Sequence, residues 1–383
     1  MRLGIAIAFF ILISSCASKE ENKQTVSDQI RVSLDTVMVD TGDEFLYLQD
    51  FLSNSSLSHG GDYFFNFDRK GFFLEKINLN NLSLDRKIKF EKEGPYGINT
   101  DNPRFLILQN GNLFFFNYKI FKEFDQSAGL IKDLKLDEIA KEYLDGFDNY
   151  VTSIFEDKQN PNRFICLILN WESFTYFLFD FDLTNQSFRK IDLPESEKYK
   201  QYRVQINQDG KDIGGYGGQM QHSIGGGKIL LSSNAFNEVQ VFDILTDSLF
   251  SIKWDTPLLG SKRSYVPPKE VEGFKDEFSE VSKKSDEDIS YKNFLWDDKN
   301  ERYLRFSEKK KFGIDKNEFG SYISTGSDVY LSIFDKDFKL ISEAQLPKLT
   351  SLSMTHFVKD GNIWMYENID DELAFVILKI EEV

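Results

Sequence analysis

The sequence is poor in cysteine and histidine, it has fewer positive than negative charges, and it lacks an apolar run long enough to span a bilayer. Among 383 residues there are two cysteines and three histidines, and 46 Lys and Arg stand against 62 Asp and Glu, which gives a formal net charge of -16. No basic stripe offsets this charge, so we expect no nucleic acid partner. A hydrophobic content of 41% is typical of a globular protein.

An apolar run over residues 3–13 follows Arg2 and leads into Ser14-Ser15-Cys16. A run this short behind a positive residue indicates a signal peptide and not a membrane-spanning helix. Ile13-Ser14-Ser15-Cys16 resembles the lipobox of bacterial lipoproteins, in which the cysteine sulfur receives a diacylglyceryl group. We therefore expect a signal peptide over 1–15, a lipidated Cys16 with a flexible tether over 16–29, and a folded domain over 30–383. An ordinary cleaved signal is the alternative.

The residues behind Cys16 bear on where the protein is displayed. Lys19-Glu20-Glu21 resembles the surface-export signal of Bacteroidetes-type lipoproteins. The prediction is a protein anchored in the outer membrane through lipid at Cys16 and exposed on the cell surface. If the segment is only a solvated tether, the protein faces the periplasm instead.

Phenylalanine, with 37 residues, is the excess in the composition, and it favours strands. Six apolar segments recur at intervals of roughly 50 to 75 residues, each directly behind a turn rich in Gly, Asn or Asp. The segments are Tyr63-Phe64-Phe65, Leu113-Phe114-Phe115, Phe164-Ile165-Cys166, Ile229-Leu230-Leu231, Tyr303-Leu304-Arg305 and Ile363-Trp364-Met365. A later apolar residue followed by Asp or Asn, such as Phe242-Asp243, marks the end of a third strand. The pattern predicts repeated four-stranded antiparallel meanders, which are propeller blades in size and strand number.

The sixth repeat reaches the end of the chain with only three strands of its own. Residues 30–39 alternate between apolar and polar side chains and provide a spare strand at the other end. We therefore predict an all-β fold: a six-bladed β-propeller closed by the N-terminal strand, which removes the exposed sheet edges. Two stacked β-sandwiches are the alternative, but no linker divides the chain near its middle.

Two insertions depart from the repeat. Residues 137–144 begin with Asp137, an N-cap residue type, and have helical spacing, and the excursion over 254–288 is charged and helical in its second half. Both connect the fourth strand of one repeat to the first strand of the next. In a propeller, such connections lie on one face, where ligands usually bind.

The segment Glu91-Lys92-Glu93-Gly94-Pro95-Tyr96-Gly97-Ile98 resembles the Gly-Pro segment after the first blade of six-bladed propeller lipoproteins from Bacteroidetes. Together with the lipobox, the length and the Phe-rich hairpins, it makes nearly the whole chain similar to their domain-of-unknown-function lipoprotein family. These motifs are structural. The resemblance implies the fold and the anchor, and it implies no activity or catalytic residue.

Candidate ligand-binding residues are few. His222 and His356 fall at equivalent positions of the predicted inner strands of blades four and six, where they would line the central channel if they point inward. Plain structural packing is the favoured alternative. Tyr216 interrupts the glycine-rich run 214–218, which is either an anion-approaching backbone or a flexible loop. Arg104 and Gln219 complete the predicted set. Cys166, in an apolar strand, is expected to be a buried inert thiol.

No nucleophile elbow, Ser-His-Asp order or metal-ligand pattern is recognisable, and we expect no cofactor or metal. The leading hypothesis is a non-enzymatic propeller that binds an extracellular or periplasmic ligand or protein on the face carrying the loops 91–103, 193–218 and 254–288. The alternative is a hydrolase or lyase acting on extracellular glycans or peptides, whose carboxylates need not be close in sequence. A purely structural envelope component is the third hypothesis.

Overall fold

The computed structural model describes residues 30–273 and 276–381, and these residues are almost entirely β-structure. They form six four-stranded antiparallel sheets and one three-stranded sheet. Cys16 and the predicted signal peptide and tether lie outside the described residues.

We number the four-stranded sheets 1 to 6 in chain order. Sheet 1 contains β2 (Ser55–Leu57), β3 (Tyr63–Asp68), β4 (Phe73–Asn78) and β5 (Ser83–Lys89). Sheet 2 contains β6 (Arg104–Ile107), β7 (Leu113–Asn117), β8 (Ile120–Phe124) and β9 (Leu130–Asp133). Sheet 3 contains β10 (Asn149–Asp157), β11 (Asn160–Asn170), β12 (Thr175–Asp182) and β13 (Ser187–Asp192).

The second half of the chain repeats this arrangement. Sheet 4 contains β16 (Met220–Gly225), β17 (Lys228–Ser233), β18 (Phe236–Asp243) and β19 (Ser248–Lys253). Sheet 5 contains β21 (Ser290–Asp297), β22 (Arg302–Lys316), β23 (Tyr322–Asp335) and β24 (Leu340–Gln345). Sheet 6 contains β25 (His356–Lys359), β26 (Asn362–Ile369), β27 (Glu372–Glu381) and β1 (Arg31–Met38).

The N-terminal strand completes sheet 6, as the sequence predicted. Strand β1 pairs antiparallel with β27, and Val32 lies opposite Ile380. In sheets 1 to 5 the strands follow one another in chain order, so each is a simple meander. Hairpin turns join the first and second strands, with positive φ at Gly61 (72°) and Gly361 (79°), where a residue without a Cβ is least strained. In sheet 3 the turn lies at residues 158–159, and the predicted turn residues 160–162 begin β11 instead.

The hydrophobic core lies between successive sheets, and the sheets form a ring. Phe67 of sheet 1 packs on Phe115 of sheet 2 at 5.3 Å between ring centroids, and Phe114 of sheet 2 packs on Phe164 of sheet 3 at 5.6 Å. Further clusters join sheets 3 and 4, 4 and 5, and 5 and 6. Phe64 of sheet 1 packs on Phe375 of sheet 6 at 5.6 Å, which closes the ring.

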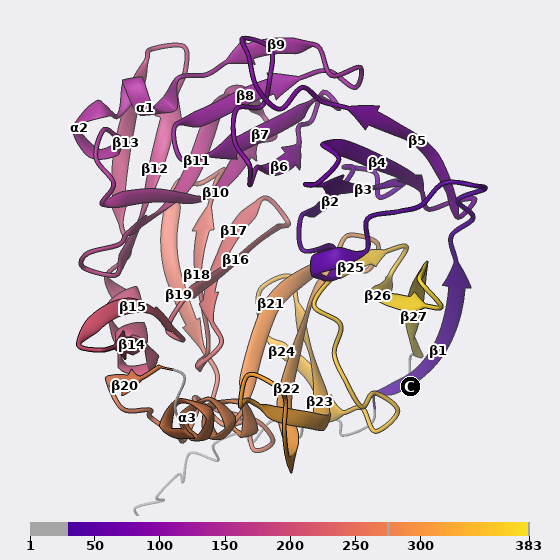
Figure 1. Cartoon of the computed structure of the whole chain (residues 1–383), viewed down its shortest axis with the longest axis vertical. Helices are drawn as coiled ribbons and strands as arrows, with labels where there is room; N and C mark the ends of the chain where they lie inside the picture. The colour runs from indigo at the N-terminus through magenta and orange to yellow at the C-terminus, as the bar shows by residue number, and fades with distance from the viewer. Residues whose placement is uncertain (1–29, 274–275, 382–383) are drawn as a thin grey trace, which may run out of the picture.

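Figure 1 shows the same succession, with the sheets placed around a central axis and the yellow end of the chain beside the indigo beginning. Each sheet therefore covers two neighbours, and two facing sandwiches would not produce this pattern. The architecture is all-β and propeller-like, and the large Phe content fills the wedges between twisted sheets.

Short helices occur in the connections, as predicted, but one expectation about them is wrong. Helices α1 (Leu136–Ile139) and α2 (Lys141–Leu144) lie between sheets 2 and 3, and α3 (Asp276–Glu287) lies between sheets 4 and 5. Asp137 does not cap α1: the N-cap is Lys135, whose left-handed backbone turns the chain without a side-chain hydrogen bond. No helix among residues 30–273 and 276–381 is long and apolar enough to cross a membrane.

The sequence did not predict the remaining elements. The 3-10 helix η1 (Gln49–Leu52) precedes sheet 1, and η2 (Pro194–Tyr202) follows sheet 3. Behind η2, β14 (Val204–Gln208) pairs with β15 (Lys211–Tyr216) and, in parallel, with β20 (Glu270–Glu272). This three-stranded side sheet packs beside α3, at the lower left of Figure 1. The predicted flexible loop around the glycine-rich run is therefore largely ordered strand.

Candidate functional site at the mouth of the central hollow

The connections between successive sheets all lie at one end of the sheets. Each sheet is an up-and-down meander of four strands, so the chain leaves it at the end where the turn between its second and third strands also lies. We call this end the loop face and the opposite end the turn face. The predicted ligand loops 91–103, 193–218 and 254–288 all lie between sheets, on the loop face.

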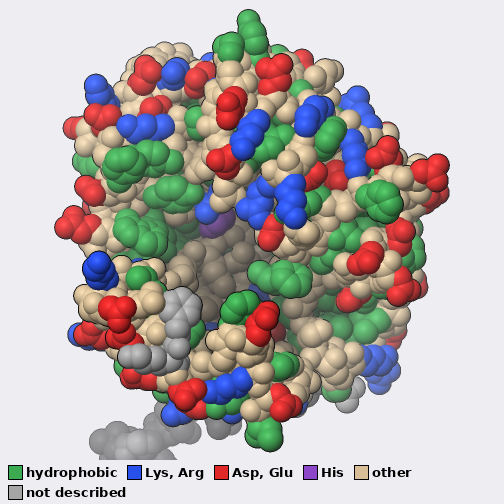
Figure 2. Space-filling model, in the orientation of Figure 1, with side chains coloured by type: hydrophobic (Ala, Val, Ile, Leu, Met, Phe, Trp, Pro, Cys, Tyr) green, Lys and Arg blue, Asp and Glu red, His purple; other side chains and the backbone are tan. Residues whose placement is uncertain are grey.

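The first strand of each sheet lies nearest the axis, and β16 contacts β21, which in turn contacts β25. The space-filling view is hollowed at its centre, with a histidine side chain inside the hollow and Lys or Arg side chains near its upper rim (Figure 2). Hydrophobic side chains gather on the left side of the hollow in the same view (Figure 2).

Three first strands bring polar side chains together at the loop face. Arg104, at the start of β6, donates a 2.5 Å hydrogen bond from Nη1 to the carbonyl oxygen of Thr152 in β10. Its guanidinium lies over the ring of Tyr150, 5.4 Å from the centroid, and Tyr150 donates from its hydroxyl to Asn117. His222 of β16 contacts the same strand through the ring of Phe155. Sheets 2, 3 and 4 thus contribute one side chain each to this corner.

His222 is a neutral imidazole at physiological pH. It is half-buried and meets the ring of Phe155 edge-on at 5.7 Å. Burial, with a smaller effect of the Arg104 charge, lowers the pKa of His222 to about 4. A neutral ring offers one donor and one acceptor to a ligand and carries no charge of its own.

The structure does not bring His356 to the same place. Its Nδ1 lies 2.9 Å from the carbonyl oxygen of Ser353, and its ring meets Phe306 of sheet 5 edge-on at 5.4 Å. Burial lowers the pKa of His356, and the charges of Lys292 and Glu308 act in opposite directions on it. No interaction joins His222 and His356 in the described part of the chain, so the two imidazoles have separate packing partners.

The other predicted residues lie beside this corner. Tyr216 ends β15 and meets Phe278 edge-on at 5.7 Å, so it belongs to the contact between the side sheet and α3. Gln219 is exposed in the link to β16. The glycines between them pack on Arg203: a Cβ on Gly218 would lie 3.2 Å from the Arg203 Cβ. Close backbone packing is the reason for glycine here.

Sequence reasoning missed an aromatic group on the same face. Trp171, in the turn after β11, is 57% exposed, and Arg203 lies over its ring at 5.5 Å and over the buried Phe174 ring at 3.8 Å. Phe147 is 84% exposed and stacks on Tyr118 with ring centroids 5.3 Å apart. No local pattern signals either contact, because Trp171 and Arg203, like Tyr118 and Phe147, are far apart along the chain.

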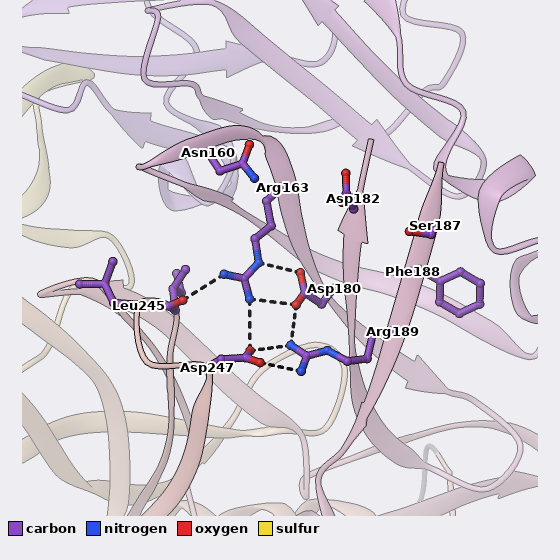
Figure 3. Close-up of a pocket in the computed structure, with 10 residues that line it drawn as sticks. Asn160, Arg163, Asp180, Asp182, Ser187, Phe188, Arg189, Leu245 and Asp247 are labelled. Atoms are coloured by element: carbon purple, nitrogen blue, oxygen red, sulfur yellow. Dashed lines mark hydrogen bonds and ion pairs between the residues drawn. The ribbon is translucent and has the colours of Figure 1, made fainter. Parts of the chain in front are cut away.

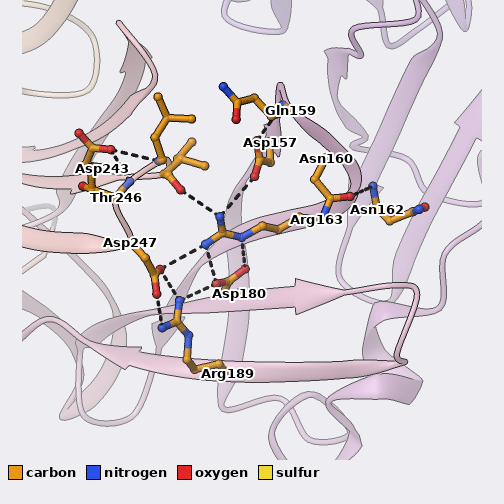
Figure 4. Close-up of polar contacts among 12 residues, drawn as sticks. Asp157, Gln159, Asn160, Asn162, Arg163, Asp180, Arg189, Asp243, Thr246 and Asp247 are labelled. Atoms are coloured by element: carbon orange, nitrogen blue, oxygen red, sulfur yellow. Dashed lines mark hydrogen bonds and ion pairs between the residues drawn. The ribbon is translucent and has the colours of Figure 1, made fainter.

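The turn face carries a different pocket, of about 420 Å³, between sheets 3 and 4 (Figure 3). Arg163 and Asp180 form a two-fold ion pair, with Nε and Nη2 each 2.9 Å from a carboxylate oxygen. Arg189 donates to Asp180 at 2.7 Å and to Asp247, in the β18–β19 turn, at 2.6 Å. Arg163 also donates to Asp157, as Figure 4 shows. Its Nη1 donates in addition to the Ile244 carbonyl oxygen at 3.0 Å.

These charged groups pair with one another across the two sheets, so few of their donors and acceptors remain for a ligand. Arg163 donates hydrogen bonds from Nε, Nη1 and Nη2. The Arg189 guanidinium holds the pKa of Asp247 below its usual range. A carboxylate held ionised by guanidinium groups is a poor general acid. The pocket is therefore an inter-sheet clamp.

Other candidate chemistry is limited in the described residues. Cys166 is fully buried in β11, and burial raises the pKa of its thiol, as expected for an inert side chain. Across residues 30–273 and 276–381, no three His, Cys, Asp or Glu side chains are grouped so as to hold a metal ion. His59 is exposed and lines a smaller pocket of about 260 Å³ on the turn face.

Comparison with known proteins gives a family and a fold. The family model described as "Domain of unknown function (DUF4221)" matches residues 27–345. A crystal structure of a member of that family from Bacteroides vulgatus superposes with a TM-score of 0.64 at 14% identity, covering 93% of this chain and 100% of that one. At this identity the likeness establishes a shared fold.

Two further structures are more distant. A candidate exported protein from Bacteroides fragilis gives a TM-score of 0.49 at 9% identity, with 94% of this chain and 98% of that one covered. The β-propeller domain of Swd1 from Myceliophteria thermophila gives 0.37 at 9% identity, with 85% and 95% covered. No curated protein matches the sequence.

Proposed function

The chain belongs to the DUF4221 family, and we propose that it is an exported, lipid-anchored binding protein. In this proposal the six four-stranded sheets are the blades of one propeller. The side sheet is built on the loop face from two insertions, β14 and β15 between blades 3 and 4 and β20 between blades 4 and 5. The ligand binds at the mouth of the central hollow, and the lipid on Cys16 retains the protein at the outer membrane, with the binding domain on the cell surface.

The observation that carries the binding proposal is the convergence at the mouth. Arg104 and His222 come from sheets 2 and 4 and both contact β10 of sheet 3. Arg104 donates a 2.5 Å hydrogen bond to Thr152 and lies over the Tyr150 ring, and His222 meets the Phe155 ring edge-on. A concave site lined by aromatic rings and a few converging polar groups is the usual form of a ligand site. Stability alone does not require an exposed arginine there.

Binding is tested with soluble protein in which Cys16 is replaced by serine, screened against arrays of glycans and peptides. We expect at least one ligand class to be retained by the parent protein and lost by Arg104→Gln and by Tyr150→Ala. Arg31→Gln, an exposed arginine on the outermost strand of sheet 6, is the matched control and should bind as the parent does. If every ligand retained by the parent is equally retained by both mouth variants, the proposed site is wrong.

The anchor is tested in cells. Growth with an alkyne-bearing fatty acid should label the parent protein and leave Cys16→Ser unlabelled. Protease added to intact cells should digest the parent protein if it is surface-displayed. Complete protection in intact cells with digestion after lysis would place the domain on the periplasmic side.

A further inference from the structure

Two arginines on the loop face have no carboxylate partner. Four of the ten arginines in the described residues form ion pairs. Arg263 and Arg305, which form none, are buried and donate to backbone carbonyl oxygens. Arg163 and Arg189 on the turn face are both ion-paired. Neither Arg104 nor Arg203 forms an ion pair within residues 30–273 and 276–381. Arg104 contacts the Thr152 carbonyl oxygen and the Tyr150 ring, and Arg203 contacts aromatic rings.

Both guanidinium groups lie against aromatic faces. Arg104 lies 5.4 Å from the Tyr150 centroid, and Arg203 lies 3.8 Å from Phe174 and 5.5 Å from Trp171. A ring face holds a guanidinium in place and leaves its in-plane N–H donors free. Of the five donors of Arg104, one is used in a hydrogen bond, to the Thr152 carbonyl oxygen.

The two arginine–aromatic pairs lie at the loop-face end of sheet 3, where β10 begins and β11 ends. Tyr150 follows Asn149, which accepts a 2.9 Å hydrogen bond from the side chain of Asn170, and Asn170 precedes Trp171. The Trp171 amide donates at 2.6 Å to the carbonyl oxygen of Asp148. The hydrogen-bonded ends of β10 and β11 therefore connect Arg104, Tyr150, Trp171 and Arg203 into one row. We call it the arginine–aromatic row.

The burial of Arg203 adds to this geometry. Its side chain is half-buried against Phe174 and the glycine-rich run, and a Cβ on Gly215 would lie 3.1 Å from its Cζ. Burial lowers the pKa of Arg203 because its charge is only weakly compensated by neighbouring groups. A carboxylate placed beside it would provide the missing compensation and a two-fold hydrogen bond.

We propose that the arginine–aromatic row binds an acidic glycan, with uronate carboxylates on Arg104 and Arg203 and sugar rings packed on the exposed Trp171 and the half-buried Tyr150. The proposal rests on the proposed function and names its ligand class. The two aromatic rings provide flat apolar platforms for the C–H faces of a sugar, and guanidinium groups without an ion pair match a planar carboxylate.

The test uses titration calorimetry with oligogalacturonate and oligoglucuronate, each compared with its fully methyl-esterified form. The ester keeps the sugar body and removes the charge. We expect the parent protein to bind at least one free acid roughly tenfold or more tightly than its ester. Arg104→Gln and Arg203→Gln should each reduce this acid-to-ester ratio to about threefold or less, while Trp171→Ala should weaken acid and ester alike.

Controls separate loss of fold from loss of recognition. Arg31→Gln should keep the ratio of the parent protein, and an unchanged thermal midpoint confirms that each variant is folded. Should Arg203→Gln fail to fold, Arg203→Lys retains the charge without the planar fork and should still lower the ratio. Rising salt should weaken binding of the acid more than binding of the ester.

Three results would overturn the inference. One is equal binding of acid and ester, which leaves the proposed binding function standing. Another is no binding of either uronide, and the third is preferential capture of peptides through a free C-terminal carboxylate. The proposed function itself fails separately, when the mouth variants bind every ligand found on the arrays as the parent does.

Discussion

Val32, in the first described strand, lies opposite Ile380, in the last one, and the pairing continues from Arg31 with Glu381 to Met38 with Ala374. Strand β1 thereby covers the edge of β27, which would otherwise present unpaired backbone groups. The ring of sheets is held closed by two segments from opposite ends of the chain.

Breaking this pairing should destabilise the whole ring. Replacing both Leu34 and Asp35 with proline removes at least one ladder hydrogen bond and distorts β1, so we expect a loss of about 3 kcal/mol or more in the free energy of unfolding. Urea denaturation measures the loss, and light scattering should report association through the uncovered edge. The same double replacement at Lys23 and Gln24, before β1, is the control. Equal stability of the two variants would contradict closure by β1.

The clamp between sheets 3 and 4 depends on Asp180. Its side chain is 11% exposed and accepts from both Arg163 and Arg189. Asp180→Asn should cost about 3 kcal/mol in unfolding free energy, because it leaves two guanidinium groups short of charge compensation. Asp192→Asn, which removes the exposed pair with Lys190 on the same sheet, should cost about 0.5 kcal/mol. Similar costs for the two variants in chemical denaturation would remove the clamp as a stabilising feature.

Close packing, and not φ alone, should explain glycine at position 217. Gly217 and Gly210 both have φ +75°, but a Cβ on Gly217 would lie 2.3 Å from the Tyr202 carbonyl oxygen, whereas one on Gly210 meets nothing within 4 Å. Gly210→Ala should cost about 1 kcal/mol for the left-handed backbone. Gly217→Ala should cost about 2 kcal/mol more because the Cβ collides with backbone. Matched losses in urea denaturation would show that φ is the whole effect.

His222 should make the folded state sensitive to acid. Its pKa is 6.5 as an isolated side chain and about 4 in the fold, so the unfolded chain binds a proton that the folded chain excludes between these values. The contribution of neutral His222 to the free energy of unfolding is therefore fully present above about pH 6.5. It is lost as the pH falls toward 4, by roughly 3 kcal/mol at most. The free energy of unfolding, measured at pH 7 and pH 4.5, should fall more for the parent protein than for His222→Gln. Parallel decreases would assign the acid sensitivity to other groups.

Repeat-based reasoning predicted much of the fold because the relevant signals are local. Each hairpin turn and each apolar strand, such as residues 163–168, is specified by neighbours along the chain. The spare strand over 30–39 was predictable because counting strands left the last repeat one short. The side sheet was not predictable, since β14 pairs in parallel with β20 across more than sixty residues and neither strand has a strong alternation of its own.

In the candidate site, too, single residues could be predicted from the sequence but their contacts could not. His222 and Arg104 were singled out from the sequence, and the structure brings them to one corner of the loop face, but His356 packs against a different sheet. Trp171 and Arg203 were missed because their contact joins a turn of sheet 3 to the end of η2. The pairs of Asp180 with Arg163 and Arg189 join three strands of sheet 3, and Asp247 of sheet 4 joins them only because the two sheets are adjacent.

The sequence by itself determined the meanders, their number of strands and the need for a strand from the other end of the chain, because alternation, turn residues and repeat length act over a few residues at a time. Only the tertiary structure decided which polar and aromatic side chains meet. These contacts depend on the twist and stagger between sheets, which bring Arg104 to Thr152 of the next sheet and Arg203 onto Trp171. No local pattern in the chain encodes that geometry.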